Sequence, residues 1–314
     1  MNFYVGVTDK GWFDFLRQEP REDVNFWKPS GQRFAAIAPG DFFLFKLRKP
    51  HHCIAGVGQF ASQIQLRLPQ AWDIFGPRNG AATYEQFARL IHRNRHQTLE
   101  AGSEITCIVL NAPVFFQEAD WIPAPADWAD GIVQGKGYSD QLPVGQRLWA
   151  AVQATLPRYQ SGLYVPGLAA TSPSLVLEES PARYGLALTR MRLGQGAFRA
   201  TVTEAYGKRC AISGEKTLPV LEAAHIQPYA EAGPSTIGNG LLLRSDLHTL
   251  FDKHYLTVNA DDLVIEVSPR IREEFSNGKE YYRFHGQPLQ VIPRNVAERP
   301  AQQYLRHHNE RFRG

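Results

Sequence analysis

A stretch rich in proline, glycine and serine divides the 314-residue chain. It covers residues 156–181 and contains Ser-Gly, Pro-Gly and Ser-Pro dipeptides. Segments of this composition bury little apolar surface, and they commonly connect domains. The sequence therefore predicts a first domain at residues 1–158, a linker at residues 159–185 and a second domain at residues 186–314.

The composition is that of a folded protein that does not span a membrane. Hydrophobic residues make up 43% of the chain and charged residues 21%, which excludes the disordered and fibrous classes. Its three cysteines, Cys53, Cys107 and Cys210, are odd in number and form no Cys-x-x-Cys pair. This argues against a disulfide framework and a cysteine zinc site. The N-terminus lacks the features of a signal peptide, so we expect a cytoplasmic location.

The basic excess lies in the second part of the chain. Residues 1–180 carry 16 basic and 17 acidic side chains, whereas residues 181–314 carry 18 and 14. A phosphate-facing surface is therefore expected in the second domain. Ordinary solvated charge explains so small an excess as well, and the two interpretations stay open.

The first domain is predicted to be α+β. Short β-rich segments, separated by Pro39-Gly40 and by Pro50, indicate hairpins. The pattern fits a strongly bent sheet or a small β-barrel with helices. The expected strands cover residues 2–7, 34–37, 41–47, 54–60, 105–110 and 114–116, and the expected helices cover residues 83–93 and 145–156.

The second domain is predicted to alternate short helices and strands. Ser245 is a typical N-cap, because its hydroxyl can accept a hydrogen bond from a free N–H group in the first turn. Proline at 300 favours the start of a last helix. The expected helices cover residues 197–206, 246–253 and 300–312, and the expected strands cover residues 220–226, 240–243, 255–258 and 263–267.

Three polar side chains of the second domain suit phosphodiester hydrolysis. His248 and Asp252 are four residues apart in the predicted helix, so they share one face and can bind one divalent cation. His225 lies on the predicted strand. A neutral imidazole placed beside that helix can take a proton from water, while the cation stabilises the leaving oxygen.

The strings Glu222-Ala-Ala-His-Ile, Asn239-Gly-Leu-Leu-Leu and Asp246-Leu-His-Thr-Leu-Phe-Asp resemble the HNH nuclease family, in its restriction-type variant. The resemblance covers roughly residues 186–314, and it implies a fold of two strands and a helix around one metal. By this resemblance His225 is the general base, and Asn239 orients it through backbone hydrogen bonds. His248 and Asp252 are ligands of Mg²⁺ or Mn²⁺.

The chain departs from the family pattern at two places. Many relatives carry His or Asp just before the base, but here Ala224 cannot coordinate a metal. Glu222 shares the strand face of Ala224 and is our candidate replacement ligand. Many relatives also have two Cys-x-x-Cys pairs, which this chain lacks. Four further histidines match nothing in the motif, and we expect surface or packing roles for them: His254, His285, His307 and His308.

Basic residues gather just before the nuclease strings. Arg192 and Arg199 flank a glycine-containing segment, and Lys208 and Arg209 follow. Arginine binds phosphate with bidentate geometry, so we predict DNA contacts for these four residues. Ordinary surface positions on a helix explain them equally well.

The first domain is rich in aromatic residues. Its strings Asn25-Phe-Trp-Lys-Pro and Ala71-Trp-Asp-Ile-Phe, with the following Asn79-Gly80, resemble the PUA-like superfamily and, within it, the EVE-like readers. Such domains take an extruded base into an aromatic pocket, where a small modification can be recognised. Lys46 and Arg48, at a strand end, are expected to reach flanking phosphates. The predicted pocket residues are Trp27, Trp72, Asn25 and Asn79, although a tryptophan is more often part of a core.

These observations predict a modification-dependent, type IV-like DNA restriction endonuclease. It would recognise methylated or hydroxymethylated cytosine in double-stranded DNA and use a one-metal HNH mechanism. One HNH core cuts one strand, so a homodimer is expected, at least on DNA. Three alternatives stay open: a restriction enzyme that reads an unmodified sequence, a non-catalytic binder with a degenerate HNH domain, and an RNA-directed protein.

Overall fold

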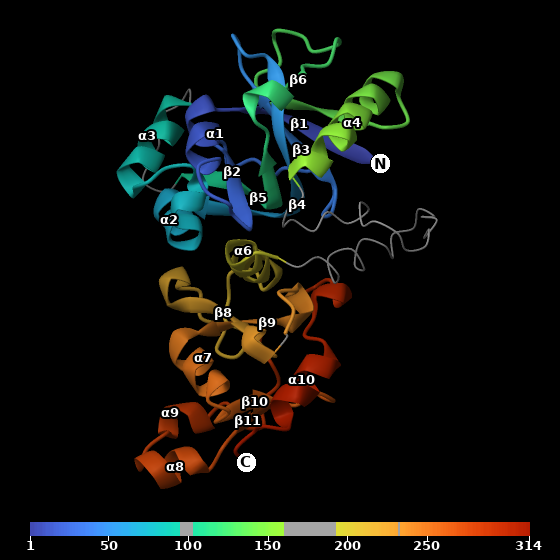
Figure 1. Ribbon diagram of the computed structural model, residues 1–314. Coiled ribbons are helices and arrows are strands. Elements are labelled where there is room, and N and C mark those ends of the chain that lie inside the picture. The colour runs from blue at the N-terminus through green and yellow to red at the C-terminus, as the bar shows by residue number, and fades with distance from the viewer. Residues whose placement is uncertain (95–102, 160–192, 232) are drawn as a thin grey trace. The chain divides into compact units, whose positions relative to one another are not determined.

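The computed structural model describes residues 1–94, 103–159, 193–231 and 233–314. The chain divides into two units, Met1–Tyr184 and Gly185–Gly314, coloured from blue to green and from yellow to red in Figure 1. Most of the predicted linker lies outside the described residues, and so does Arg192. Within the described parts, no helix has the length and apolar character that a membrane crossing requires.

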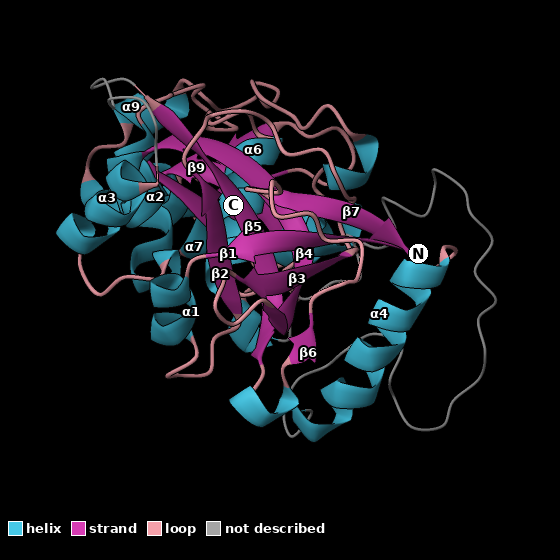
Figure 2. Ribbon diagram, turned by 90° about the horizontal axis from the view of Figure 1, so that it is seen from above, coloured by secondary structure: helices cyan, strands magenta, loops and turns pink. Residues whose placement is uncertain are grey.

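A seven-stranded sheet forms the centre of unit 1, with strand order β2-β5-β4-β3-β1-β7 and β6 paired to β4. β1 and β3 are parallel, and the other pairs are antiparallel. Figure 2 shows these strands in magenta. Their bounds are β1 Asn2–Thr8, β2 Asp23–Lys28, β3 Phe42–Leu47, β4 Cys53–Arg67, β5 Glu104–Phe115, β6 Ile122–Pro123 and β7 Gly135–Ser139.

The expected closed barrel is not found among these strands. β2 and β7 are the two ends of the strand order and do not pair with each other, so the sheet is open. The register of β4 against β5 shifts twice, between Val57 and Gln59 and between Phe60 and Ser62. Such bulges bend and twist a strand. The sheet therefore has the predicted bend without closing.

Several local predictions for unit 1 need correction. The two strands expected at 105–110 and 114–116 are one long strand, β5, and residues 34–37 form no strand. β2, β7 and the first two helices were not predicted, because their apolar periods are short and mixed with polar residues. The helices are α1 Lys10–Leu16, α2 Leu68–Phe75, α3 Tyr84–Arg93 and α4 Pro143–Thr155.

Unit 2 contains two separate strand pairs and short helices. β8 and β9 are antiparallel, with His225 opposite Gly240, and Leu241 to Leu243 of β9 are fully buried. β10 and β11 form the predicted hairpin. The elements are α6 Gln195–Ala205, β8 Leu221–His225, β9 Gly240–Arg244, α7 Ser245–Asp252, β10 Leu256–Val258, β11 Ile265–Val267, α8 Arg270–Phe275, α9 Lys279–Tyr282 and α10 Gln302–Asn309.

The start of α7 differs from the prediction. Ser245 is the first helical residue, and Arg244 occupies the N-cap position without a side-chain capping bond. The Arg244 guanidinium instead lies 2.6 Å from Asp246 Oδ1. The carboxylate of Asp246 stands in the first turn of α7, where negative charge is favoured by the helix dipole. The Arg244–Asp246 ion pair therefore marks the start of this helix.

Gly80 is a glycine on which the packing of unit 1 depends. Its φ is +83°, and a Cβ atom there would lie 2.2 Å from Trp12 Cδ1. Trp12 is 2% exposed, so its ring has no room to move. A side chain at position 80 would combine left-handed backbone strain with overpacking.

We expect Gly80→Ala to destabilise unit 1 by about 2–4 kcal/mol, from overpacking and backbone strain together. All six tryptophans lie in residues 1–149, so tryptophan fluorescence during thermal unfolding reports on this unit alone. Gly131→Ala is the matched control, because a Cβ there meets no atom within 4 Å. Equal unfolding midpoints for the two variants would contradict this account.

Candidate active site

One cavity of unit 2 collects the side chains that the sequence singled out for chemistry. It has a volume of about 450 Å³ and lies where β8 and α7 meet. His225 reaches it from the end of β8, and His248 and Asp252 reach it from one face of α7. The residues that line it are Ala223, His225, Ile226, Pro228, His248, Asp252, His254 and His308.

His225 is held by an aromatic ring and a hydroxyl. Its imidazole stacks on Phe198 of α6, with centroids 3.9 Å apart and planes 10° apart. Its Nε2 lies 3.3 Å from Ser235 Oγ. Burial lowers the pKa of His225, and the neighbouring charge of His248 lowers it further, against an opposing effect of Asp252. His225 is therefore neutral near pH 7, which is the form that accepts a proton.

Asn239 closes the loop between β8 and β9 and does not line the cavity. Its Oδ1 accepts a hydrogen bond from Gln227 N at 2.8 Å, and its Nδ2 donates to Gln227 O at 3.0 Å and to Pro234 O at 2.9 Å. The side chain is fully buried. All of its polar atoms thus serve the backbone that follows His225, so Asn239 is a positioning residue.

His248 has a carboxylate at each ring nitrogen. Nδ1 lies 2.6 Å from Glu222 Oε2, and Nε2 lies 3.3 Å from Asp252 Oδ2. Burial lowers the pKa of His248, but hydrogen bonds to Asp252 and Glu222 outweigh it and leave the pKa raised. Because the two nitrogens face opposite edges of the ring, Glu222 and Asp252 cannot both join Nε2 around one cation.

The donor set fits a cation held by two protein ligands. His248 Nε2 and Asp252 Oδ2 are separated by the distance expected when each lies about 2 Å from one metal ion. No group of three or more potential ligands is assembled in the parts of the chain that the structure describes. Glu222 instead accepts a hydrogen bond from Nδ1–H, and in the neutral ring this bond favours the tautomer whose Nε2 can bind a cation.

Two histidines that the sequence assigned to surface or packing roles border this cavity. His308 has a packing role: it is 2% exposed, and burial lowers its pKa to about 4. His254 lies two residues after Asp252 with a φ of 59°, and its Nδ1 is 3.3 Å from His308 Nε2. Its position was missed because no string of the motif includes it.

The predicted DNA-contact residues do not line the cavity. Arg199 lies on α6 and is half-buried, Lys208 is half-buried with a φ of 58°, and Arg209 is exposed. Arg192 lies outside the described residues. Contacts of these four residues with DNA stay a prediction.

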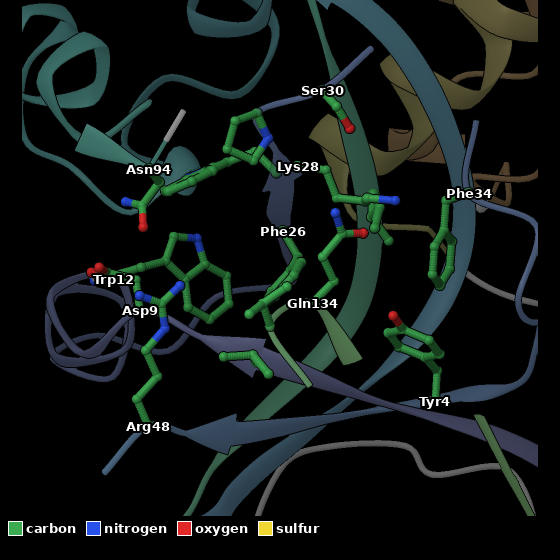
Figure 3. A pocket seen from close by; sticks show the side chains of 15 residues that line it. Tyr4, Asp9, Trp12, Phe26, Lys28, Ser30, Phe34, Arg48, Asn94 and Gln134 are labelled. Carbon is green, nitrogen blue, oxygen red and sulfur yellow. Dashed lines mark hydrogen bonds between the residues drawn. The ribbon is translucent and has the colours of Figure 1, made fainter. Parts of the chain in front are cut away.

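A second cavity, which we call the aromatic pocket, lies in unit 1 and has a volume of about 370 Å³. Tyr4 and Phe34 line it together with Phe26 and Trp12, as Figure 3 shows. The rest of its lining consists of charged or polar residues and of apolar or aromatic ones: Asp9, Lys28, Ser30, Arg48, Asn94 and Gln134, and Val7, Trp27, Pro29, Ile108 and Val133.

Only Trp27 among the four predicted pocket residues borders the aromatic pocket. Trp72 stacks on Phe87, with centroids 6.2 Å apart, and does not line it. Asn25 and Asn79 are fully buried and bond to each other at 2.8 Å. Trp27 Nε1 donates to Asn79 O at 3.0 Å. The two asparagines therefore support the wall of the pocket and do not line it. The sequence does not distinguish these two roles for a short polar residue.

Comparison with known proteins identifies the family of one part of the second unit. Residues 210–259 match the HNH_2 family, described as HNH endonuclease. This range contains β8, β9, α7 and all the residues predicted for catalysis or metal binding. The chain therefore contains an HNH endonuclease domain. No curated protein matches the sequence.

Two solved structures show distant likeness. ASCH from Zymomonas mobilis is 12% identical with a TM-score of 0.34, over 47% of this chain and 94% of its own. The modification-dependent TagI restriction endonuclease is 13% identical with a TM-score of 0.29, over 99% of this chain and 81% of its own. Both TM-scores are low, so neither likeness establishes an activity here.

Replacing Glu222 tests the arrangement at His248. We expect Glu222→Gln to lower the pKa of His248, because one of the two carboxylates that raise it is lost. NMR titration of the metal-free protein measures this pKa. Mn²⁺ affinity, measured by calorimetry, should also fall, by about 10- to 100-fold. Glu273→Gln, an exposed change on α8, is the control; an unaltered His248 pKa in Glu222→Gln would rule out the contact.

Proposed function

We propose that this protein is a modification-dependent DNA endonuclease. The observation that carries the proposal is that His225, His248 and Asp252 border one cavity of an HNH endonuclease domain. The first is neutral near pH 7, and the other two offer an imidazole nitrogen and a carboxylate oxygen 3.3 Å apart. A base beside a cation site is the arrangement that one-metal hydrolysis of a phosphodiester needs.

His225 acts as the general base in this proposal. Its ring removes a proton from a water molecule as the oxygen of that water attacks phosphorus. Phe198 fixes the plane of the ring, so its orientation needs no adjustment on binding. Burial keeps the ring neutral, which makes the rate insensitive to pH above neutrality and lower in acid.

His248 Nε2 and Asp252 are the residues that would hold Mg²⁺ or Mn²⁺. When bound, such an ion supplies positive charge to the leaving oxygen and to the phosphorane. Ala224 offers no donor, and Glu222 is engaged at Nδ1. Waters and phosphate oxygens are therefore needed to complete the coordination.

The aromatic pocket of unit 1 is proposed to read the base. A cytosine turned out of the duplex can stack on aromatic rings, which places its 5-substituent against apolar walls. The pocket volume of about 370 Å³ falls in the usual range for small-ligand sites, about 300–1,000 Å³. Methylcytosine and hydroxymethylcytosine in double-stranded DNA are the proposed targets.

Assembly and location follow from the same proposal. One HNH core cuts one strand, so double-strand cleavage requires two copies, and we propose a homodimer on DNA. The three cysteines are buried free thiols. Free thiols suit a reducing compartment, in agreement with a cytoplasmic restriction enzyme.

One observation favours a second candidate function, a modified-DNA binder without cleavage. Within the described residues, two protein ligands meet at the proposed cation site, whereas a typical catalytic zinc site has three. In that case the HNH domain would hold DNA without hydrolysing it. The binder hypothesis predicts no nicking by the unaltered protein with any divalent cation.

His225→Ala tests the nuclease proposal. We expect it to lower the rate of Mn²⁺-dependent cleavage of methylcytosine DNA by at least about 100-fold, because a general base contributes about 10²–10⁴, while DNA affinity is retained. His92→Ala, on an exposed face of α3, should cut at the normal rate. A parent protein that nicks neither modified nor plain DNA would leave the binder hypothesis as the better account.

Phe26→Leu tests the reader proposal. Phe26 is half-buried and lines the aromatic pocket, and its loss removes a stacking face worth about 1–3 kcal/mol per base. We expect the preference for methylcytosine over cytosine DNA to fall at least fivefold in a binding assay. Phe42→Leu, equally half-buried but packed on Trp149, should keep it. Equal affinity of the parent for both DNAs would indicate an enzyme that reads unmodified sequence.

A further inference from the structure

A groove lined by basic side chains adjoins the aromatic pocket of unit 1. Its volume is about 460 Å³. Val7, Arg48, Asn94 and Val133 line both this groove and the aromatic pocket, so the two spaces are adjacent. We call it the anion groove, for the ligand argued below, and its remaining lining residues are Lys46, Lys49, His52, Arg93, Trp128, Asp130 and Ile132.

Lys46 forms the floor of the anion groove and is 4% exposed. Its ammonium lies 3.2 Å from His52 Nδ1 and 4.9 Å from the centre of the Trp128 ring. Burial lowers its pKa, despite partial compensation from nearby Cys53 and Asp130. In the described parts of unit 1, no carboxylate lies within hydrogen-bond distance of this ammonium. Lys46 was predicted to reach flanking phosphates, but little of its surface is accessible to a ligand because the residue is 4% exposed.

The charges around the groove do not balance. Lys49 pairs with Asp130 at 3.0 Å, and Arg93 pairs with Asp9 at 2.8 Å. Arg48 is exposed, and within the described residues its guanidinium has no hydrogen-bond or ion-pair partner. Lys46 and Arg48 therefore leave two positive charges without a matching carboxylate. A buried cation without a counter-charge is costly, and an anionic ligand removes that cost.

The unpaired cations extend to the aromatic pocket. Figure 3 shows the Arg48 side chain rising from the end of β3 towards the pocket. Lys28 lines the pocket as well, and burial lowers its pKa. A ligand that fills both spaces must therefore join a flat apolar ring to a negative charge. A nucleotide has this form.

We propose that the anion groove binds the DNA phosphodiester next to the nucleotide whose base enters the aromatic pocket. This inference rests on the proposed function and adds a second, sequence-independent site to it. Arg48 contacts the phosphate at the junction of the two spaces. Lys46 stays beneath it, orients His52 and supplies positive potential. Phosphate contacts of this kind set position and affinity, while the aromatic pocket sets preference.

Binding to DNA measures the groove separately from cleavage. The parent for this experiment is the full chain with His225→Ala, and Kd is determined at several salt concentrations for duplexes with methylcytosine and with plain cytosine. We expect Arg48→Gln to weaken binding to both duplexes by the same factor, about 3- to 10-fold. The slope of log Kd against log salt should fall by about one.

Arg147→Gln is the matched control, because Arg147 is an exposed cation on α4 of the same unit, away from the groove. It should leave both Kd and the salt slope unchanged. Arg48→Glu should weaken binding more than Arg48→Gln. In contrast, Phe26→Leu should change the preference between the two duplexes with the salt slope retained.

Three results would overturn the anion groove: an unaltered salt slope in Arg48→Gln, an equal loss in Arg147→Gln, or no DNA binding by the parent. Tighter binding to an RNA duplex of the same sequence would overturn the assignment to DNA. A different result would show that the nuclease proposal fails while the anion groove stands. If the natural chain does not cut, but Arg48→Gln weakens DNA binding as expected, the groove stands and the catalytic assignment fails.

Discussion

The amide side chain of Asn239 bonds to Gln227 and Pro234 and closes the loop between β8 and β9. Because this loop begins directly after His225, those bonds fix where β8 ends and which way its last side chain points. The strand pair then sets the start of α7, since Arg244 ends β9 and Ser245 begins the helix. The buried amide of Asn239 thus helps to place His225 of β8 and His248 of α7 at the same cavity. Removing that amide would leave buried backbone groups unpaired.

The sequence predicted the second unit better than the first. His248 and Asp252 share a face of α7, as their spacing of four residues requires, and the strand carrying His225 begins within one residue of its predicted position. The sequence could not predict which carboxylate would lie at which ring nitrogen of His248. Spacing places Glu222 near the helix, but only the packing of β8 against α7 decides that it meets Nδ1. The position of His254 was missed because it lies outside the motif strings, and the turn after α7, where its φ is 59°, brings it to the cavity.

Unit 1 shows the limits of composition as a guide. Its aromatic richness correctly indicated an aromatic cavity, and Trp27 lines it. Nothing in the local strings separates Trp27 from Trp72, which packs on Phe87 instead. The difference arises from the pairing of β2 with β5 and from the placement of α2, both long-range features. The bend of the sheet was predictable from its short, interrupted strands. Its open form was not, because it depends on whether the edge strands β2 and β7 pair with each other.

Asn79 has a consequence for the base recognition that we propose for the aromatic pocket. Its Nδ2 donates to Ala71 O and Gly76 O, and its Oδ1 accepts from Asn25. Strand β2, which carries Trp27, is thereby fastened to the end of α2 through one residue sealed from water. Because these bonds hold the pocket wall in one conformation before a ligand binds, little conformational entropy of the wall is lost on binding. If the pocket binds a base as proposed, its selectivity would depend on the fixed dimensions of this wall, and a substituent too large for the pocket would be excluded.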